Sequence, residues 1–149
     1  MNENIKDNIY YVSSMIEYVS RISKNHRSYV AVCLGKKGIL HELESAEVNH
    51  CLSFEQVSDE WINYYGIADG DFDTVENCEY DVPPVTAIGR VYQYLIINDM
   101  EEKRIDANEA ILNVFTSFIS DKISDFNTST FYSAPDYLRC SYNAGVLLP

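Results

Sequence analysis

Apolar residues recur at steps of three and four along most of the chain, the spacing that places them on one face of an α-helix. The first such stripe covers Ile5–Ile22, and Tyr11, Met15 and Tyr18 add a second stripe beside it. A helix that is apolar over two faces packs against neighbours on both. We therefore expect this first helix to be central and largely buried, with Asn4 as its N-cap.

Shorter amphipathic stretches follow, separated by cap and turn residues. Ser28 is suited to begin a helix that ends near Gly35, and another short helix is expected over Ile39–Ala46. Ser53 then opens a capping box, in which a Ser side chain and a Gln side chain satisfy free N–H groups at the helix start. The helix after it carries Trp61 on its apolar face, so we expect Trp61 to be buried.

The last third of the chain repeats this pattern. A helix is expected over Val85–Ile96, and a longer one over Ala107–Ile123, which has the cleanest apolar stripe of the chain. Asp106 and Glu109 have the spacing of a second capping box. The Ser-, Thr- and Asn-rich stretch Phe126–Tyr132 is expected to be a loop or a brief extended piece, followed by a last short helix.

No alternation typical of a β-strand extends beyond four residues, so the sequence predicts an all-α fold. We expect a compact bundle of about six or seven helices. The stretch 67–84 carries six carboxylates and no basic residue. This acidic connector, as we call residues 67–84, joins an N-terminal helical half, residues 1–66, to a C-terminal helical half, residues 85–149, within a single domain.

The formal net charge is −12, and the connector contributes half of it. Such a charge repels the phosphates of nucleic acids and of anionic membranes, so neither is expected as a partner. A basic protein is favoured electrostatically. The alternative is that the acidity serves only solubility.

Location and redox state follow from the apolar runs and the cysteines. The N-terminus is polar, and no apolar run approaches the roughly 18 residues of a membrane-spanning helix. The four cysteines lack the spacing of a metal or disulfide motif. We therefore expect a cytoplasmic protein with free thiols.

Few residues are suited to chemistry. No two histidines have the spacing of zinc ligands, and the adjacent His50 and Cys51 point apart in most backbones. Cys51 is the best placed thiol nucleophile, although it needs a His brought beside it by the fold. Asp69, Asp71 and Asp73 begin like a calcium loop, but the glycine and the final glutamate of that loop are missing. We expect no catalytic, cofactor or metal site.

Aromatic residues flank the acidic connector or lie within it. Rings supply contact area and carboxylates steer a basic partner, so the combination is typical of a protein-binding surface. The expected partner-binding residues are Tyr64, Tyr65, Asp69, Asp71, Phe72, Asp73, Glu76 and Tyr80. The alternative is that these rings pack the seam between the two halves.

One stretch carries a family resemblance. Its features are the opening helix Ile9–Tyr18, then Ser28-x-Val30, Leu34-Gly35-Lys36-Lys37-Gly38-Ile39, Leu43, His50, Glu55 and Asp59-Glu60-Trp61-Ile62. With these features, residues 9–65 resemble a family of short bacterial helical proteins encoded beside putative toxins with an ADP-ribosyltransferase-like fold. By genomic association, the resemblance implies a toxin-neutralising or toxin-associated role.

The leading hypothesis is a non-enzymatic cytosolic protein-binding module, an antitoxin or immunity-type protein that binds a bacterial effector. Two other classes stay open. One is an accessory or adaptor subunit of a bacterial or phage system. The other is a small enzyme with an unrecognised site, using Cys51 or the carboxylates of Asp69–Asp81.

Overall fold

The computed structural model describes residues 1–149, and helices are its only regular elements. The elements are α1 Glu3–Ser23, α2 Arg27–Asn49, α3 Phe54–Tyr64, α4 Val85–Lys103, α5 Ala107–Thr116, α6 Ile119–Ser124, the 3-10 helix η1 Thr130–Tyr132, and α7 Pro135–Ala144. The expected all-α fold is confirmed. No helix combines the length and the apolar character needed to cross a membrane.

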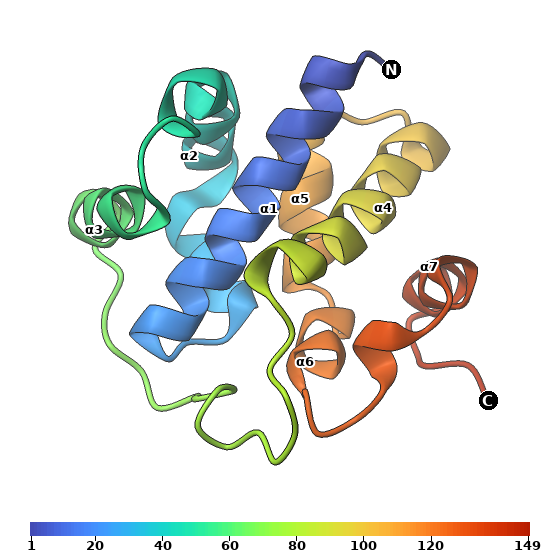
Figure 1. Cartoon of the computed structure of the whole chain (residues 1–149). Coiled ribbons are helices and arrows are strands. Elements are labelled where there is room, and N and C mark those ends of the chain that lie inside the picture. Colours follow the sequence, from blue (N-terminus) through green and yellow to red (C-terminus); the bar gives the residue numbers. More distant parts are fainter.

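α1 is the central helix, with α2 and α3 on one side and α4 on the other (Figure 1). Its fully buried apolar side chains are Ile9, Val12, Met15, Ile16 and Val19. The prediction of a central, largely buried first helix is therefore confirmed. Its ends are less covered than its middle, because Ile5 is 38% exposed and Ile22 is 55% exposed.

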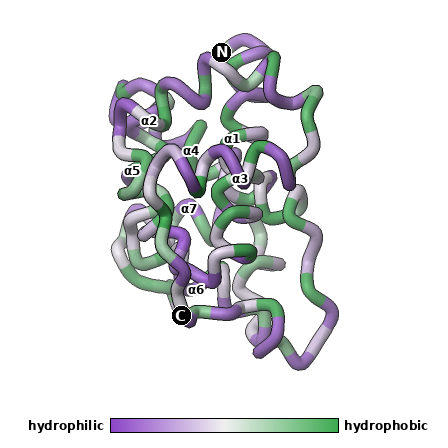
Figure 2. Tube along the Cα trace, turned by 90° about the vertical axis from the view of Figure 1, so that its left-hand side faces the viewer, coloured by the Kyte–Doolittle hydropathy of each residue, from purple (hydrophilic) through white to green (hydrophobic).

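Helices from before and after the connector share one core of 27 buried apolar residues. α4 packs along α1, and α5 packs along α2. Along these helices hydrophobic and hydrophilic positions change over at short intervals, as amphipathic packing requires (Figure 2). Gly89 of α4 lies against Ser14 of α1, and a side chain at position 89 would collide with Ser14.

α2 consists of two helical pieces joined by a kink at Gly35, so the expected end of a helix near Gly35 is confirmed. The second piece is longer than the expected helix Ile39–Ala46. Gly35 has φ 66° and ψ 176°, a conformation that is essentially restricted to glycine. Helical structure resumes at once after Gly35 and continues to Asn49. The side-chain amide of Asn108 donates a hydrogen bond of 3.3 Å to the carbonyl of Lys36, so the kink is docked on the first turn of α5.

The first two helices begin earlier than predicted. Asn2, not Asn4, caps α1, and its side-chain oxygen accepts a hydrogen bond of 2.9 Å from the N–H of Ile5. His26 occupies the N-cap position of α2 in place of Ser28, without a side-chain cap. Each start lies two residues before the predicted one, a difference that is usual for helix ends.

Of the two predicted capping boxes, only the first has its expected cap. The hydroxyl of Ser53 accepts a hydrogen bond of 3.1 Å from the N–H of Gln56, as predicted. Asp106 stands at the N-cap of α5 but makes no side-chain cap. Glu109 instead forms an ion pair of 2.9 Å with Lys36 of α2. Glu109 therefore makes a contact between two helices in place of the predicted capping-box contact within α5.

Two expectations for the C-terminal half were wrong. The predicted helix Ala107–Ile123 divides into α5 and α6, because Ser117 is extended and its hydroxyl donates a hydrogen bond of 2.7 Å to the carbonyl of Val114. The predicted loop Phe126–Tyr132 contains the short 3-10 helix Thr130–Tyr132.

Candidate protein-interaction surface

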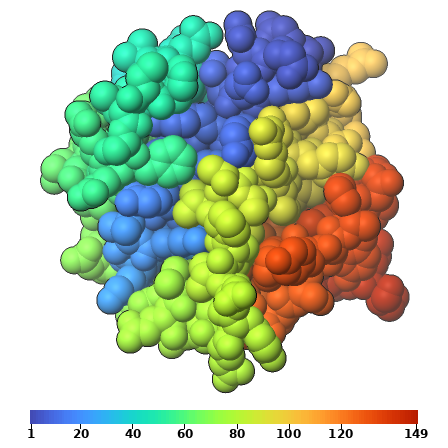
Figure 3. Space-filling model, in the orientation of Figure 1, coloured from blue at the N-terminus to red at the C-terminus, as the bar shows by residue number.

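The connector follows a fixed path across the turn between α1 and α2. The N–H of Gly70 donates to the carbonyl of Ser23 at 2.8 Å, and the N–H of Phe72 donates to the carbonyl of Lys24 at 2.8 Å. Figure 3 shows the connector, in yellow-green, lying between α1, in blue, and the orange C-terminal segment. It is a part of the folded body, although it contains no helix.

A buried ion pair in the core binds the connector on its inner side. Arg27 donates to both carboxylate oxygens of Glu17, at 2.8 and 2.6 Å, and also to the hydroxyl of Thr74 at 3.0 Å. Arg21 donates to Glu17 at 2.7 Å and to the carbonyl of Pro83 at 2.8 Å. Glu17 thus orients both arginines, and each arginine donates a hydrogen bond to a different residue of the connector.

Glu17 has no contact with water, and its ionisation depends on those two arginines. Burial alone would raise the pKa of the Glu17 carboxyl, but the charges and hydrogen bonds of Arg27 and Arg21 hold this pKa below its usual value. The carboxylate therefore stays ionised in the core and keeps both arginines in place.

Asn127 holds the connector from the other side. Its side-chain oxygen accepts a hydrogen bond of 2.7 Å from the N–H of Glu79, and its amide donates to the carbonyl of Asn77 at 3.0 Å. Asn127 lies in the loop after α6, so the C-terminal half contributes a second anchor. Both bonds are made to main-chain groups, and they fix the backbone of the connector at this point.

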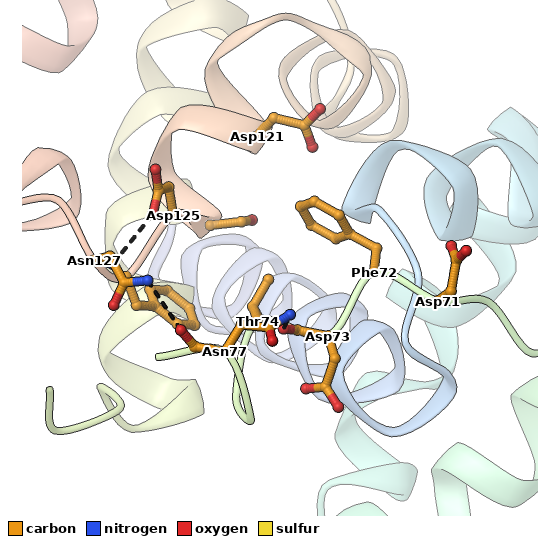
Figure 4. Close-up of a pocket in the computed structure, with 10 residues that line it drawn as sticks. Asp71, Phe72, Asp73, Thr74, Asn77, Asp121, Asp125 and Asn127 are labelled. Atoms are coloured by element: carbon orange, nitrogen blue, oxygen red, sulfur yellow. Dashed lines mark hydrogen bonds between the residues drawn. The ribbon is translucent and has the colours of Figure 1, made fainter. Parts of the chain in front are cut away.

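Between the connector and α6 lies a hollow of about 290 Å³, which we call the connector hollow. Figure 4 shows Asp121 and Asp125 of α6 and the loop after it on one side, with Phe72 and Thr74 of the connector opposite. The lining residues are Asp71, Phe72, Asp73, Thr74, Asn77, Asp121, Ser124, Asp125, Phe126 and Asn127. Four carboxylates thus surround a site that has two aromatic rings.

Asp73 has a structural role within this hollow. Its carboxylate accepts hydrogen bonds from the N–H groups of Glu76 and Val75, at 2.9 and 3.1 Å, and so closes a turn. The bond from Glu76, the bond from Val75 and the charge of Lys24, 3.9 Å away, together lower the pKa of the Asp73 carboxyl. The predicted calcium-like start is therefore a capped turn.

Asp121 faces the connector through His26. The Nδ1 atom of His26 lies 2.8 Å from a carboxylate oxygen of Asp121. The imidazole ring stacks on Phe72 with 3.8 Å between the ring centroids. The N-terminal half, the connector and α6 meet at this stack, which fixes the position of Phe72.

A second hollow of about 620 Å³ adjoins the first and shares Phe126 and Asn127 with it. We call it the aromatic shelf, and its residues are Tyr80, Asp81, Phe126, Asn127, Thr128, Ser129, Phe131 and Tyr132. Tyr80 is 68% exposed and Tyr132 is 80% exposed. The connector hollow and the aromatic shelf together form what we call the connector face.

The eight residues predicted to bind a partner do not form one patch. Asp71, Phe72 and Asp73 line the connector hollow and Tyr80 lies on the aromatic shelf, while Asp69 and Glu76 are exposed on the connector outside both. Tyr64 and Tyr65 lie instead in a cleft between α2 and α3.

The two tyrosines at the end of α3 differ in their surroundings. The Tyr65 hydroxyl donates a hydrogen bond of 2.6 Å to the carboxylate of Glu42, so this ring is fixed in the fold. Burial and the Glu42 carboxylate raise the Tyr65 pKa, which keeps the hydroxyl protonated as a donor. Tyr64 is 79% exposed and packs edge-on against Tyr65.

His50 and Cys51 lie closer together than expected. The Sγ atom of Cys51 is 4.0 Å from Nε2 of His50, although adjacency was expected to point the two apart. Nδ1 of His50 lies 3.2 Å from the carbonyl of Ala46. No group of three or more His, Cys, Asp or Glu side chains in the protein is arranged to hold a metal ion.

The residues that complete the connector face were missed at the sequence level. They are Asp121, Asp125, Phe126, Asn127, Phe131 and Tyr132, and they come from the C-terminal half. The only local signal was the loop-like composition around Phe126–Tyr132. Nothing in that composition indicates that the loop meets the connector, which lies some 50 positions earlier.

No protein-family model, no curated protein and no solved structure matches this chain. Its function is therefore inferred from its own residues and their arrangement.

Proposed function

We propose that this protein is a non-enzymatic cytosolic protein that binds a basic protein partner on the connector face. We further propose that it acts as an antitoxin or immunity-type protein against a bacterial effector. The observation that carries the binding function is the connector face itself, where exposed carboxylates and exposed aromatic rings lie on an anchored frame. The resemblance of residues 9–65 is the support for the antitoxin role.

Most carboxylates of the connector have no cationic partner within the protein. Among its six carboxylates only Asp73 has a cation within ion-pair distance, Lys24 at 3.9 Å. Carboxylates that lie side by side without cations repel one another, and they gain nothing from the core of a monomer. A basic protein surface relieves this repulsion and is drawn toward it from a distance.

The aromatic rings supply apolar contact area, which the carboxylates do not. Tyr80 and Tyr132 present large exposed rings beside the carboxylates, and tyrosine is enriched among residues that dominate binding energy. Because hydrogen bonds from the core and from Asn127 already hold the connector, little conformational entropy remains to be lost on binding. The connector face therefore has steering charge, contact area and a preformed backbone.

The test is binding to the product of the adjacent gene, measured by surface plasmon resonance. A variant with Asp69→Asn, Asp71→Asn and Glu76→Gln loses three exposed charges of the connector. We expect about tenfold weaker binding, since three rim charges at about 0.5 kcal/mol each amount to roughly one factor of ten.

The matched control carries Glu44→Gln, Glu47→Gln and Glu101→Gln, three exposed acids of α2 and α4, and has the same net charge as the first variant. Its affinity is expected to stay close to that of the unaltered protein. Equal weakening of both variants would reduce the effect to net charge and contradict a role for the connector face. Binding that leaves the partner's activity intact would indicate an accessory or adaptor role.

A further inference from the structure

A second feature, apart from the connector face, is the cleft between α2 and α3, with a volume of about 730 Å³. At its base lies Glu42, which is 7% exposed. One carboxylate oxygen accepts a hydrogen bond of 3.0 Å from the indole N–H of Trp61, and the other accepts one of 2.6 Å from the hydroxyl of Tyr65. Both donors are neutral, and no cation lies within ion-pair distance of Glu42.

A buried carboxylate is costly unless its charge is compensated. A carboxylate can accept about four hydrogen bonds, so two donors leave about half of its capacity unused. Glu60, which is exposed, adds a second carboxylate to the cleft, and no Lys or Arg lines it. His41 also lines the cleft, but it makes no ion pair with Glu42 or Glu60, so neither carboxylate has a cationic partner within the protein.

Tyr11 of α1 does not line the cleft, but the charges of Glu42 and Glu60 act on it. Its hydroxyl is buried and has no hydrogen-bond partner. Burial, with the charges of Glu42 and Glu60 adding to it, raises the pKa of Tyr11 to about 12. A phenol near two carboxylates stays protonated and adds no negative charge of its own. Within the cleft itself, the donors to Glu42 are the neutral groups of Trp61 and Tyr65.

We propose that the α2–α3 cleft binds the guanidinium group of an arginine side chain from the basic protein partner. The proposal rests on the proposed function for the source of that arginine, and on Glu42 and the rings beside it for the chemistry. The carboxylates of Glu42 and Glu60 receive the N–H groups of the guanidinium, and the face of Tyr64 or Tyr65 receives its plane.

The cleft fits a guanidinium better than other cations. A guanidinium is flat, stacks on aromatic rings and donates in a fork to carboxylates, whereas an ammonium is a strongly hydrated point charge. Tyr64 packs edge-on against Tyr65 at 4.9 Å, which sets two ring surfaces at a steep angle beside the acids. A metal ion is not suited, because no group of three ligating side chains is present.

The test uses Trp61, the only tryptophan of the chain, as a reporter inside the site. The full-length protein is titrated with N-acetyl-arginine methylamide while tryptophan emission is recorded. The matched neutral compound is N-acetyl-citrulline methylamide, which has nearly the same shape without the charge. We expect a saturable change at millimolar concentrations with the arginine compound and none with the citrulline compound.

Two variants locate the effect. Glu42→Gln removes the charge at the base but keeps an acceptor, and Glu60→Gln removes the exposed charge without touching an internal hydrogen bond. We expect the dissociation constant of the arginine compound to rise about tenfold in the first variant, the usual scale for losing one charge-assisted hydrogen bond. We expect a smaller rise in the second and no change in the control Glu44→Gln.

Equal responses to the two compounds, or an unchanged dissociation constant in both cleft variants, would overturn the proposal. If Glu42→Gln unfolds by circular dichroism, Glu60→Gln alone decides the outcome. The proposed function is tested separately, by the connector variant. A partner that still binds the Glu42→Gln protein with unchanged affinity overturns the cleft proposal alone, whereas loss of binding in the connector variant concerns the connector face.

Discussion

Glu17 orients the two arginines that bind the connector from the core. It is fully buried in α1, pairs with Arg27 and Arg21, and through them holds Thr74 and Pro83 in place. Removing one member of a buried ion pair leaves an uncompensated charge in the core. The connector face should therefore respond to a change at a site that no partner can touch.

The first prediction concerns stability and pH. Because the folded protein holds the pKa of Glu17 below its usual value, the unfolded chain takes up a proton first as the pH falls. The stabilisation is complete above the unfolded pKa of about 4.3 and is lost as the pH falls through the lower folded pKa. Denaturant midpoints measured between about pH 3 and pH 7 should show this loss.

Glu17→Gln is the informative variant. At neutral pH it should lower the free energy of unfolding by about 3–5 kcal/mol, since Arg27 loses its anionic partner in the core. Its stability should also fall less steeply with acid than that of the unaltered protein. The exposed control Glu44→Gln should keep the original slope, and a Glu17→Gln protein with that same slope would refute the linkage.

The burial of a single residue could be predicted from sequence where its position on the apolar face of a helix determined it. Trp61 was expected to be buried from its apolar face alone, and it is 2% exposed. Glu17 gave no such signal, because a glutamate within a helix ordinarily lies on the solvated face. Its burial depends on Arg27, ten positions away, and on the connector that covers both.

At the scale of elements, the sequence predicted the helices and the interruption at Gly35, but the apolar period did not predict the break at Ser117. The stripe of Ala107–Ile123 continues through Ser117, where the backbone turns without moving the apolar residues off the core side. A hydrogen bond from the Ser117 hydroxyl to the main chain ends α5 there. Such local bonds compete with the helix without altering the hydrophobic pattern, so periodicity alone does not detect them.

The second prediction concerns the kink in α2. Gly35→Ala places a Cβ atom on a backbone with φ 66° and ψ 176°, while no atom lies near enough to clash with it. The cost is therefore conformational, and we expect about 1–3 kcal/mol less stability in a denaturant melt. Lys37→Ala, an exposed helical position two residues on, should change stability by less than about 0.5 kcal/mol.

A Gly35→Ala protein of unchanged stability would mean that α2 can straighten or bend elsewhere without loss. The contacts of Lys36 with Asn108 and Glu109 argue against this, because they hold the residue after the kink against α5.

At the scale of the whole molecule, the connector face is made from two distant parts of the chain. Its first part was visible in the sequence as a run of carboxylates with neighbouring rings. Its second part, Asp121 to Tyr132, shows in the sequence only the loop-like composition of Phe126–Tyr132, and it joins the face because α6 packs beside the connector. Tertiary contact, rather than local sequence, decides which acids and rings share a surface.

The third prediction separates the charges of the connector face from its rings. Exposed charges act mainly on the encounter of two proteins, and salt screens them over about 10 Å at 0.1 M and about 3 Å at 1 M. Raising the salt concentration should therefore slow association with the basic partner and change dissociation little. Tyr80→Ala and Tyr132→Ala should do the reverse, because desolvated contact area governs how long a complex lasts.

Val48→Ala, an exposed apolar position on α2 that is 72% exposed, is the control for the two tyrosine variants and should leave both rate constants unchanged. The measurement is surface plasmon resonance at two salt concentrations with each variant. Two results would contradict this prediction: an effect of salt on the dissociation rate alone, or an unchanged dissociation rate in both tyrosine variants. In either case the acids would not set the association rate and the rings would not set the dissociation rate. The connector face would then be a solvated surface, and the partner would have to bind elsewhere on the molecule.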